Sequence, residues 1–281
     1  MTYSRRNFLK AAGTGVITSG LSAGFTSRAA ATGITNNKDP FRLAMAGYTF
    51  AKFDLDQTLA MMQRAGMRYL AIKDFHLPLD SPGEVIDETL MKLKSAGIEA
   101  YGVGPISMKT EGEVDRAFAY TRRVGVKILV AISNYEMLPY INRKVKEYDT
   151  QVAIHNHGPD TDIFSSASDI WKNIKALDAR MGICLDIGHT TRLGLDCTEE
   201  FLACRERIFD MHICDIDIPD KKGKCVEAGR GIINFPAFVK ALRKTKYTGT
   251  CSLEYWKDRA DPLPGITESI GYFRGVMAGL V

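Results

Sequence analysis

Histidines and carboxylates stand at the ends of short apolar segments along the chain, in a pattern suited to metal chemistry. The sequence has five histidines, and each lies at or just past the end of such a segment: His76, His155, His157, His189 and His212. Asp186 and Glu254 end similar segments, where charged side chains are rarely left unpaired. Imidazole nitrogens mixed with carboxylate oxygens suit Mn²⁺, Zn²⁺, Co²⁺ or Fe²⁺ better than Ca²⁺. We therefore predict one divalent metal ion, with Mn²⁺ as first choice, bound by four ligands: His155, Asp186, His212 and Glu254.

Other polar residues near these segment ends are candidates for catalysis or substrate binding. Lys73 could polarise a substrate oxygen or act as an acid or base, or it could simply pair with Asp74. We expect three catalytic residues: Glu254, His155 and Lys73. The residues expected to bind substrate are His76, His157, His189, Arg192 and Arg230. The structural alternative is a buried ion-pair cluster at the strand ends, with Arg192 capping a loop.

The elements that must position these residues are alternating strands and helices. From Phe41 onward, short runs rich in Val, Ile and Leu alternate with amphipathic stretches, which is typical of βαβ units. The predicted strands are Leu43–Tyr48, Tyr69–Asp74, Ala100–Gly104, Ile128–Ile132, Gln151–His155, Gly182–Asp186, Phe209–Cys214 and Thr250–Glu254. The predicted helices are Leu55–Ala65, Glu84–Ala96, Glu111–Val124, Ala167–Leu177, Thr198–Arg207 and Phe235–Lys244, with a short one around Tyr140–Tyr148.

Eight such units in about 250 residues predict an α/β fold with a single (β/α)₈ TIM barrel. The alternative, a doubly wound sheet, would need a glycine-rich phosphate fingerprint that the first strand-to-helix turn, Gly47-Tyr48-Thr49-Phe50, does not contain. In a barrel the C-terminal ends of all strands share one rim. Because side chains alternate along a strand, the four proposed ligands can converge there from four consecutive strands.

The N-terminus has the features of an export signal. The segment Ser4-Arg5-Arg6-Asn7-Phe8-Leu9-Lys10 is a twin-arginine pattern, followed by a weakly apolar run and by Ala29-Ala30-Ala31. We predict a twin-arginine signal peptide over residues 1–31, a barrel domain over residues 32–281, and a periplasmic or other extracytoplasmic location. A membrane anchor is disfavoured because the apolar run is short and rich in glycine and threonine.

Charge and cysteine content narrow the range of partners. The predicted leader carries four basic residues and no acidic one, so the net charge of +4 falls to zero without it. No basic field then remains to attract nucleic acid or an anionic membrane, and neither is expected as a partner. None of the six cysteines forms a CxxC pair, and a chain of this length can build a core without disulfides, so none is assigned.

A set of motifs resembles the xylose isomerase-like TIM-barrel superfamily, in its sugar phosphate isomerase/epimerase branch. These are the twin-arginine leader, His-Asn-His-Gly at 155–158, Asp-Ile-Gly-His at 186–189, Asp-Met-His-Ile-Cys-Asp at 210–215, Gly-Arg-Gly-Ile-Ile-Asn-Phe at 229–235 and Ser-Leu-Glu-Tyr at 252–255. The resemblance implies a metal held by an acidic residue ending strand five and by Asp186, His212 and Glu254. The chain departs from this pattern on strand five: ketose epimerases of the family use a glutamate there as one of two acid/base residues, and this chain has His155.

The resemblance implies a metal-dependent sugar isomerase or epimerase that removes a proton α to a carbonyl, with the metal stabilising the enediolate. Glu254 would be ligand and base, and Lys73, His157 or His189 the partner acid. Loss of a β-substituent from the same enediolate gives the alternative, a lyase or dehydratase of a 3-keto-sugar or keto-glycoside, which export would favour. A non-catalytic periplasmic sugar-binding protein is the alternative of another class. The expected partner is a small carbohydrate, and homo-oligomerisation stays open.

Overall fold

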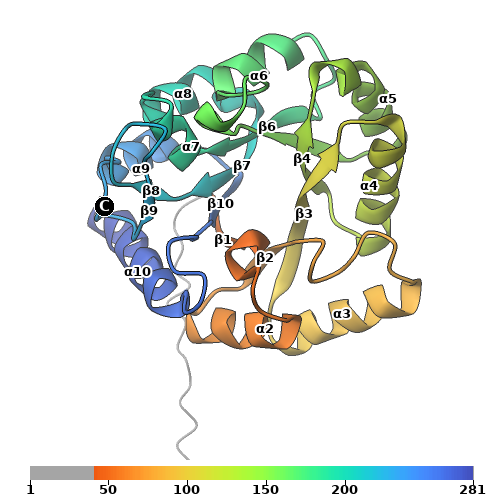
Figure 1. Ribbon diagram of the computed structural model, residues 1–281, viewed down its shortest axis with the longest axis horizontal. Helices are drawn as coiled ribbons and strands as arrows, with labels where there is room; N and C mark the ends of the chain where they lie inside the picture. The colour runs from red at the N-terminus through yellow and green to blue at the C-terminus, as the bar shows by residue number, and fades with distance from the viewer. Residues whose placement is uncertain (1–40, 281) are drawn as a thin grey trace, which may run out of the picture. The chain divides into compact units, whose positions relative to one another are not determined.

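A computed structural model describes residues 41–280, in which eight parallel strands close into a barrel. Figure 1 shows the helices as a ring around these strands. The barrel order is β1-β10-β7-β6-β5-β4-β3-β2, and every neighbouring pair is parallel. The described domain is therefore a single (β/α)₈ TIM barrel, as predicted. Its strands are β1 (Arg42–Ala46), β2 (Tyr69–Ile72), β3 (Glu99–Met108), β4 (Ile128–Ser133), β5 (Gln151–His155), β6 (Met181–Asp186), β7 (Ile208–Ile213) and β10 (Thr250–Leu253).

The predicted strands are confirmed, with differences at their ends. β3 continues to Met108, past the predicted end at Gly104. Its pairing with β4 shifts register around Gly104-Pro105, so these two residues form an irregularity within the strand instead of ending it. β10 stops one residue before Glu254, but the backbone N–H of Glu254 still donates to Ile213 O at 3.0 Å. That hydrogen bond keeps Glu254 in line with the end of β7.

The predicted helices pack against the outside of the barrel. α2 (Leu55–Arg64) and α4 (Glu111–Val124) begin with capping boxes at Asp54 and Thr110. The helix expected to be short, α5, runs over Leu138–Tyr148. The remaining predicted helices are α3 (Gly83–Ser95), α6 (Ala167–Ile174), α8 (Cys197–Cys204) and α9 (Phe235–Lys244).

Three features are not predicted by the sequence patterns. They are the short helix α7 (Ile187–Arg192), the antiparallel hairpin of β8 (Asp215–Ile216) with β9 (Cys225–Val226), and the C-terminal helix α10 (Leu263–Gly279). α7 and the hairpin are too short to show a period, and both follow strands that carry proposed ligands. Four single 3₁₀ turns complete the described elements: η1 (Gly47–Phe50), η2 (Tyr135–Met137), η3 (Gly158–Asp160) and η4 (Arg205–Arg207).

The interior of the barrel contains a polar cluster one layer below the rim. Tyr101 Oη donates to Asp210 Oδ2 at 3.0 Å, and Ser252 Oγ donates to Asp210 Oδ1 at 3.1 Å. Burial raises the pKa of Asp210 to about 6. Asp210 and Ser252 precede His212 and Glu254 by two residues, so they share the same inward face of their strands.

The predicted signal peptide, residues 1–31, lies outside the described residues. Between residues 41 and 280 no helix has the length and apolar character needed to cross a bilayer. All six cysteines are buried as free thiols.

Candidate metal centre

Four side chains from adjacent strands meet at the C-terminal end of the barrel. His155 Nε2 is 3.0 Å from His212 Nδ1 and 3.5 Å from Asp186 Oδ2. His212 Nδ1 is 3.4 Å from Glu254 Oε1 and 3.9 Å from Asp186 Oδ2. His155 and Asp186 end β5 and β6, His212 is the penultimate residue of β7, and Glu254 follows β10. The structure therefore brings together the four residues that the sequence proposes as metal ligands.

The spacing of these atoms fits a single divalent ion. Bonds of about 2.1 Å place neighbouring ligands of a tetrahedral ion about 3.4 Å apart, and the four buried ligand atoms all lie within 4.8 Å of one another. The opposite ring nitrogens, His155 Nδ1 and His212 Nε2, are buried without a hydrogen-bond partner in the described chain. The nitrogens that face the carboxylates are therefore His155 Nε2 and His212 Nδ1, and both are available to bind an ion in the space between the four side chains.

Burial and mutual attraction set the charges in the cluster. Burial lowers the pKa of His155, which is neutral. Burial also disfavours the charged form of His212, but Cys184 and Glu254 beside it outweigh this effect and raise its pKa well above the ordinary value. Burial opposes ionisation of Asp186 and Glu254, yet the imidazoles hold both pKa values below their ordinary range. The cluster thus pairs two carboxylates with one imidazole proton, which a divalent ion would displace.

Buried polar groups around the cluster fix the positions of the carboxylates. Asp186 Oδ1 accepts from His189 N at 2.6 Å, so the same residue caps α7. Asn156 Oδ1 accepts from Asp186 N at 2.8 Å, and Asn156 Nδ2 donates to Asp186 O at 3.3 Å. Thr49 Oγ1 bonds to the backbone on both sides of Glu254. The sequence patterns do not identify Asn156 and Thr49, since an amide or hydroxyl at a strand end has no distinctive pattern.

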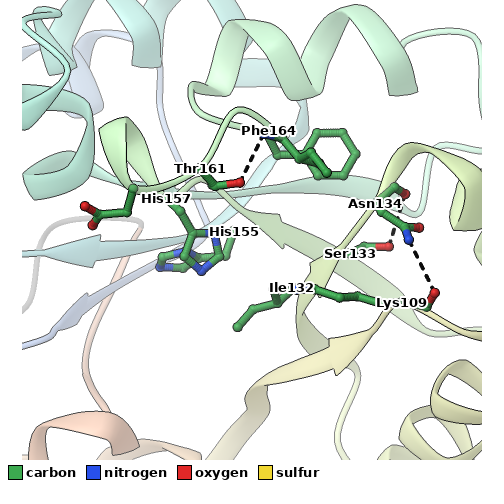
Figure 2. A pocket seen from close by; sticks show the side chains of 10 residues that line it. Lys109, Ile132, Ser133, Asn134, His155, His157, Thr161 and Phe164 are labelled. Carbon is green, nitrogen blue, oxygen red and sulfur yellow. Dashed lines mark hydrogen bonds between the residues drawn. The ribbon is translucent and has the colours of Figure 1, made fainter.

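A cavity of about 300 Å³ opens beside the cluster. Figure 2 shows His155 and His157 on one side of it and Ser133 and Asn134 on the other. Its apolar lining comes from Ile132, Ile163 and Phe164, and its polar lining includes Lys109, Asp160 and Thr161. A ligand in this pocket would lie next to an ion held by His155. Of the lining residues, only His155 and His157 were identified from the sequence, because the others follow no motif.

His157 is the substrate-binding candidate that faces this pocket. Its ring centroid is 4.6 Å from that of His155, and its imidazole has no hydrogen-bond partner among residues 41–280. Burial, together with the imidazoles of His155 and His189, lowers the pKa of His157 to about 3. A neutral imidazole in this place can donate a hydrogen bond to a ligand oxygen.

Lys73 and His76 are occupied by neighbours and do not line the pocket. Lys73 Nζ lies 2.6 Å from Asp74 Oδ1, which is the pairing that the sequence leaves open. His76 Nε2 lies 3.2 Å from Thr58 Oγ1 and 3.1 Å from Phe53 O. Both residues lie at the rim, on the side of β2.

Arg192 joins two loops of the rim. One guanidinium nitrogen donates to Asp160 Oδ2 at 2.6 Å, and the other donates to Lys221 O at 2.7 Å. The first nitrogen also lies 3.1 Å from His189 Nδ1. Arg192 and His189 therefore support the connection after β5 and the β8–β9 hairpin, and neither lines the pocket.

Arg230 lies on the surface, away from the pocket. It forms an ion pair with Glu268 of α10, and 63% of its side chain is exposed. Its neighbour Glu227 is buried and accepts hydrogen bonds from Tyr255 Oη at 2.8 Å and from Lys257 Nζ at 2.7 Å. The loop before α9 is thus anchored to the segment after β10, with Arg230 pointing to α10.

This chain belongs to the xylose isomerase-like TIM barrel family, whose model matches residues 34–276. Among solved structures, an uncharacterised protein from Parabacteroides distasonis is 28% identical, with a TM-score of 0.68 over 84% of this chain and 99% of that chain. A D-tagatose 3-epimerase-like protein is 15% identical, with a TM-score of 0.71 over 85% and 98% of the two chains. An IolI protein with a bound zinc atom is 16% identical, with a TM-score of 0.70 over 86% and 99%. The last two similarities bear on the fold alone. No functionally curated protein matches the sequence significantly.

Proposed function

We propose that this protein is a divalent-metal-dependent sugar isomerase or epimerase of the sugar phosphate isomerase/epimerase branch. The observation that carries the proposal is the buried cluster of two imidazoles and two carboxylates beside a ligand-sized pocket at the C-terminal rim. The similarity of the fold to a D-tagatose 3-epimerase-like protein and to a zinc-binding IolI protein supports it. The ligand set suits Mn²⁺, our first choice, as well as Zn²⁺, Co²⁺ or Fe²⁺.

The proposed reaction begins with removal of a proton from the carbon next to a carbonyl group. An ion at the centre would supply Lewis acidity for negative charge on the substrate oxygens. Glu254, held ionised by His212, removes the proton, and His157 donates a hydrogen bond to a substrate oxygen. Lys73 and His189 are less suited to be the partner acid, because both are engaged at the rim. Transfer of the proton to the neighbouring carbon, with the hydroxyl proton moving between the two substrate oxygens, gives an isomer. Protonation of the original carbon from the opposite face, with His157 as the partner acid, gives an epimer.

Deuterium exchange tests this proposal. The protein is incubated with Mn²⁺ and a panel of ketoses and aldoses in D₂O, and the recovered sugars are analysed by mass spectrometry. We expect deuterium in substrate or product, and its loss in Glu254→Gln. The matched control is Glu268→Gln, a surface carboxylate on α10 that should leave exchange unchanged. Sugars that bind but stay unlabelled across the panel would favour the sugar-binding alternative.

The shape of the pocket favours a second candidate, elimination from a 3-keto-sugar or keto-glycoside. The cavity extends from His155 to an apolar side at Phe164 and Ile163, where a group attached to the sugar would pack. Elimination starts with the same proton removal but expels the β-substituent, which creates an enone. With keto-glycosides, new ultraviolet absorbance and release of the free substituent would identify a lyase. Deuterium in an intact ketose without release would identify an isomerase or epimerase.

We also propose that the reaction takes place outside the cytoplasm, because of the twin-arginine pattern at Arg5-Arg6. Sugars released from external glycans are then the expected substrates. Fractionation of cells expressing the full chain should find it in the periplasm, and replacing both arginines with lysine should retain it in the cytoplasm.

A further inference from the structure

Cys184 lies beside the two histidines of the metal centre, and the roles assigned above do not use it. It precedes Asp186 by two residues on β6, so both side chains point into the barrel. It is completely buried, and its side chain contacts His212. The Cys184 sulfur and one ring nitrogen each of His155 and His212 all lie within 4.8 Å of one another.

These three residues define a different ion position from that of the four ligands described above. Among residues 41–280, no set of ligand atoms lying within 4.8 Å of one another contains the Cys184 sulfur together with oxygens of both carboxylates. Two ligands of one ion, at bond lengths of about 2.0–2.3 Å, can be no more than about 4.6 Å apart. With the side chains as they stand, Cys184 cannot share an ion with both Asp186 and Glu254. The two sets are therefore alternatives that share the same two histidines.

We propose that His155, His212 and Cys184 form a second metal site, one layer deeper in the barrel, for a thiophilic ion such as Zn²⁺, Cd²⁺ or Cu⁺. A thiolate with two imidazoles selects such ions, whereas carboxylate ligands suit Mn²⁺. Among the described residues, His155 Nδ1 and His212 Nε2 are buried without a hydrogen-bond partner, while the other two ring nitrogens face each other, Asp186 and Glu254. On binding, the ion replaces the thiol proton of Cys184 and the extra imidazole proton of His212, and both protons pass to solvent.

The shared histidines give this deeper site a consequence for the centre above it. An ion bound by Cys184 takes His155 and His212 away from Asp186 and Glu254, which leaves the upper site with its carboxylates alone. Thiophilic ions are therefore expected to inhibit a Mn²⁺-loaded enzyme by redistributing the ligands, without entering the substrate pocket. The proposal itself concerns metal binding and holds whatever reaction the upper site performs.

Cadmium absorbance provides the test, because a sulfur ligand gives an intense charge-transfer band in the ultraviolet and nitrogen or oxygen ligands do not. One equivalent of Cd²⁺ should produce the band in the wild-type chain, and Cys184→Ser should lose it. Cys204→Ser, which removes another buried thiol at the end of α8, should keep it. Glu254→Gln should also keep the band, even if it abolishes proton exchange. Absence of the band in wild type, or its survival in Cys184→Ser, would overturn the proposal.

X-ray absorption of the Cd²⁺-loaded wild-type chain gives a measurement that does not depend on any variant folding. One sulfur and two imidazole neighbours around cadmium are expected. A shell of nitrogen and oxygen only would place cadmium at the upper site and refute a role for Cys184. Deuterium exchange with Mn²⁺ in the same preparation reports on the proposed activity separately, so either idea can fail without the other.

Discussion

His155 changes the charge balance of the metal centre relative to a site in which strand five supplies a carboxylate. An imidazole brings no negative charge, so Asp186 and Glu254 alone would balance the charge of a divalent ion bound there. A neutral centre with two nitrogen ligands favours borderline ions over Mg²⁺ or Ca²⁺. In the proposed reaction Glu254 is the better placed of the two carboxylates to act as a base, since Asp186 is committed to the start of α7.

Replacing Asp186 with Asn should weaken metal binding while the barrel stays folded. The change removes one of two negative charges, but the amide oxygen can still accept the hydrogen bond from His189 N that caps α7. Mutation of groups that only hydrogen-bond to metal ligands typically weakens metal affinity by about 10–100-fold. Loss of the charge on a ligand itself should therefore weaken Mn²⁺ affinity by at least about tenfold. Isothermal titration with Mn²⁺ measures this. The control is Asp160→Asn, which changes a rim carboxylate outside the ligand set and should bind Mn²⁺ as wild type does. Unchanged Mn²⁺ affinity in Asp186→Asn would contradict the assignment of Asp186 as a ligand.

Loops of the rim depend on Arg192, which connects the segment after β5 to the β8–β9 hairpin. Arg192→Ala should loosen both loops, because it removes charge-assisted hydrogen bonds to Asp160 and to Lys221 O. Asp160 is partly exposed, so each such bond contributes about 0.2–1 kcal/mol, and the three bonds of Arg192 together contribute roughly 1–2 kcal/mol. We expect amide hydrogen exchange of residues 157–165 and 217–224 to accelerate by about tenfold or more, with metal affinity preserved. The control is Arg205→Ala, which replaces an exposed arginine in η4. If the two loops exchange their amide hydrogens equally slowly in both variants, Arg192 does not hold these loops together.

A second loop, before α9, depends on Glu227. Burial opposes ionisation of Glu227, but Lys257 and Tyr255 outweigh it and lower its pKa to about 2, from an ordinary value of 4.5. Because the folded-state pKa is depressed, the stabilisation is complete above about pH 4.5 and is lost as the pH falls toward 2. Glu227→Gln should lower Tm at pH 7 and flatten the fall of Tm with acid. Melting curves between pH 7 and pH 2.5 measure this fall of Tm, with Glu88→Gln, at an exposed position, as the control. If Tm falls with acid in parallel for Glu227→Gln and wild type, Glu227 does not provide this pH-dependent stability.

The strands and the four-residue cluster at their ends could be predicted from the sequence, whereas the pairings of the loop residues around that cluster could not. A carboxylate such as Asp186 or Glu254 at the end of an apolar run is unusual enough to identify a site, and the barrel makes those ends meet. Arg192 and Arg230 pair with groups 29 to 38 residues away, across loops that have no period. Cys184 reads as an ordinary apolar strand residue until the neighbouring strands bring two imidazoles beside it.

In the barrel as a whole, the metal centre and the pocket occupy neighbouring sectors. The ligands come from β5, β6, β7 and the end of β10, which are consecutive around the barrel. The pocket lies over the ends of β3, β4 and β5, so β5 contributes to both through His155. An ion at the centre would add a direct link between the ends of these four strands to the side-chain contacts already there, and it should stabilise the folded barrel.

Metal removal should accordingly lower the melting temperature of the whole domain. An ion that binds only the native state at 100 times its Kd adds about 2.7 kcal/mol of stability. For a domain of this size each kcal/mol shifts Tm by roughly 2–4 °C, so Mn²⁺ should raise Tm by about 5–11 °C and EDTA should reverse the change. Asp186→Asn, with affinity at least about tenfold weaker, should show no more than about half of this shift at the same Mn²⁺ concentration. Coincident calorimetric transitions with Mn²⁺ and with EDTA, in a wild-type chain shown to be folded, would mean that the four side chains do not hold an ion in the native barrel.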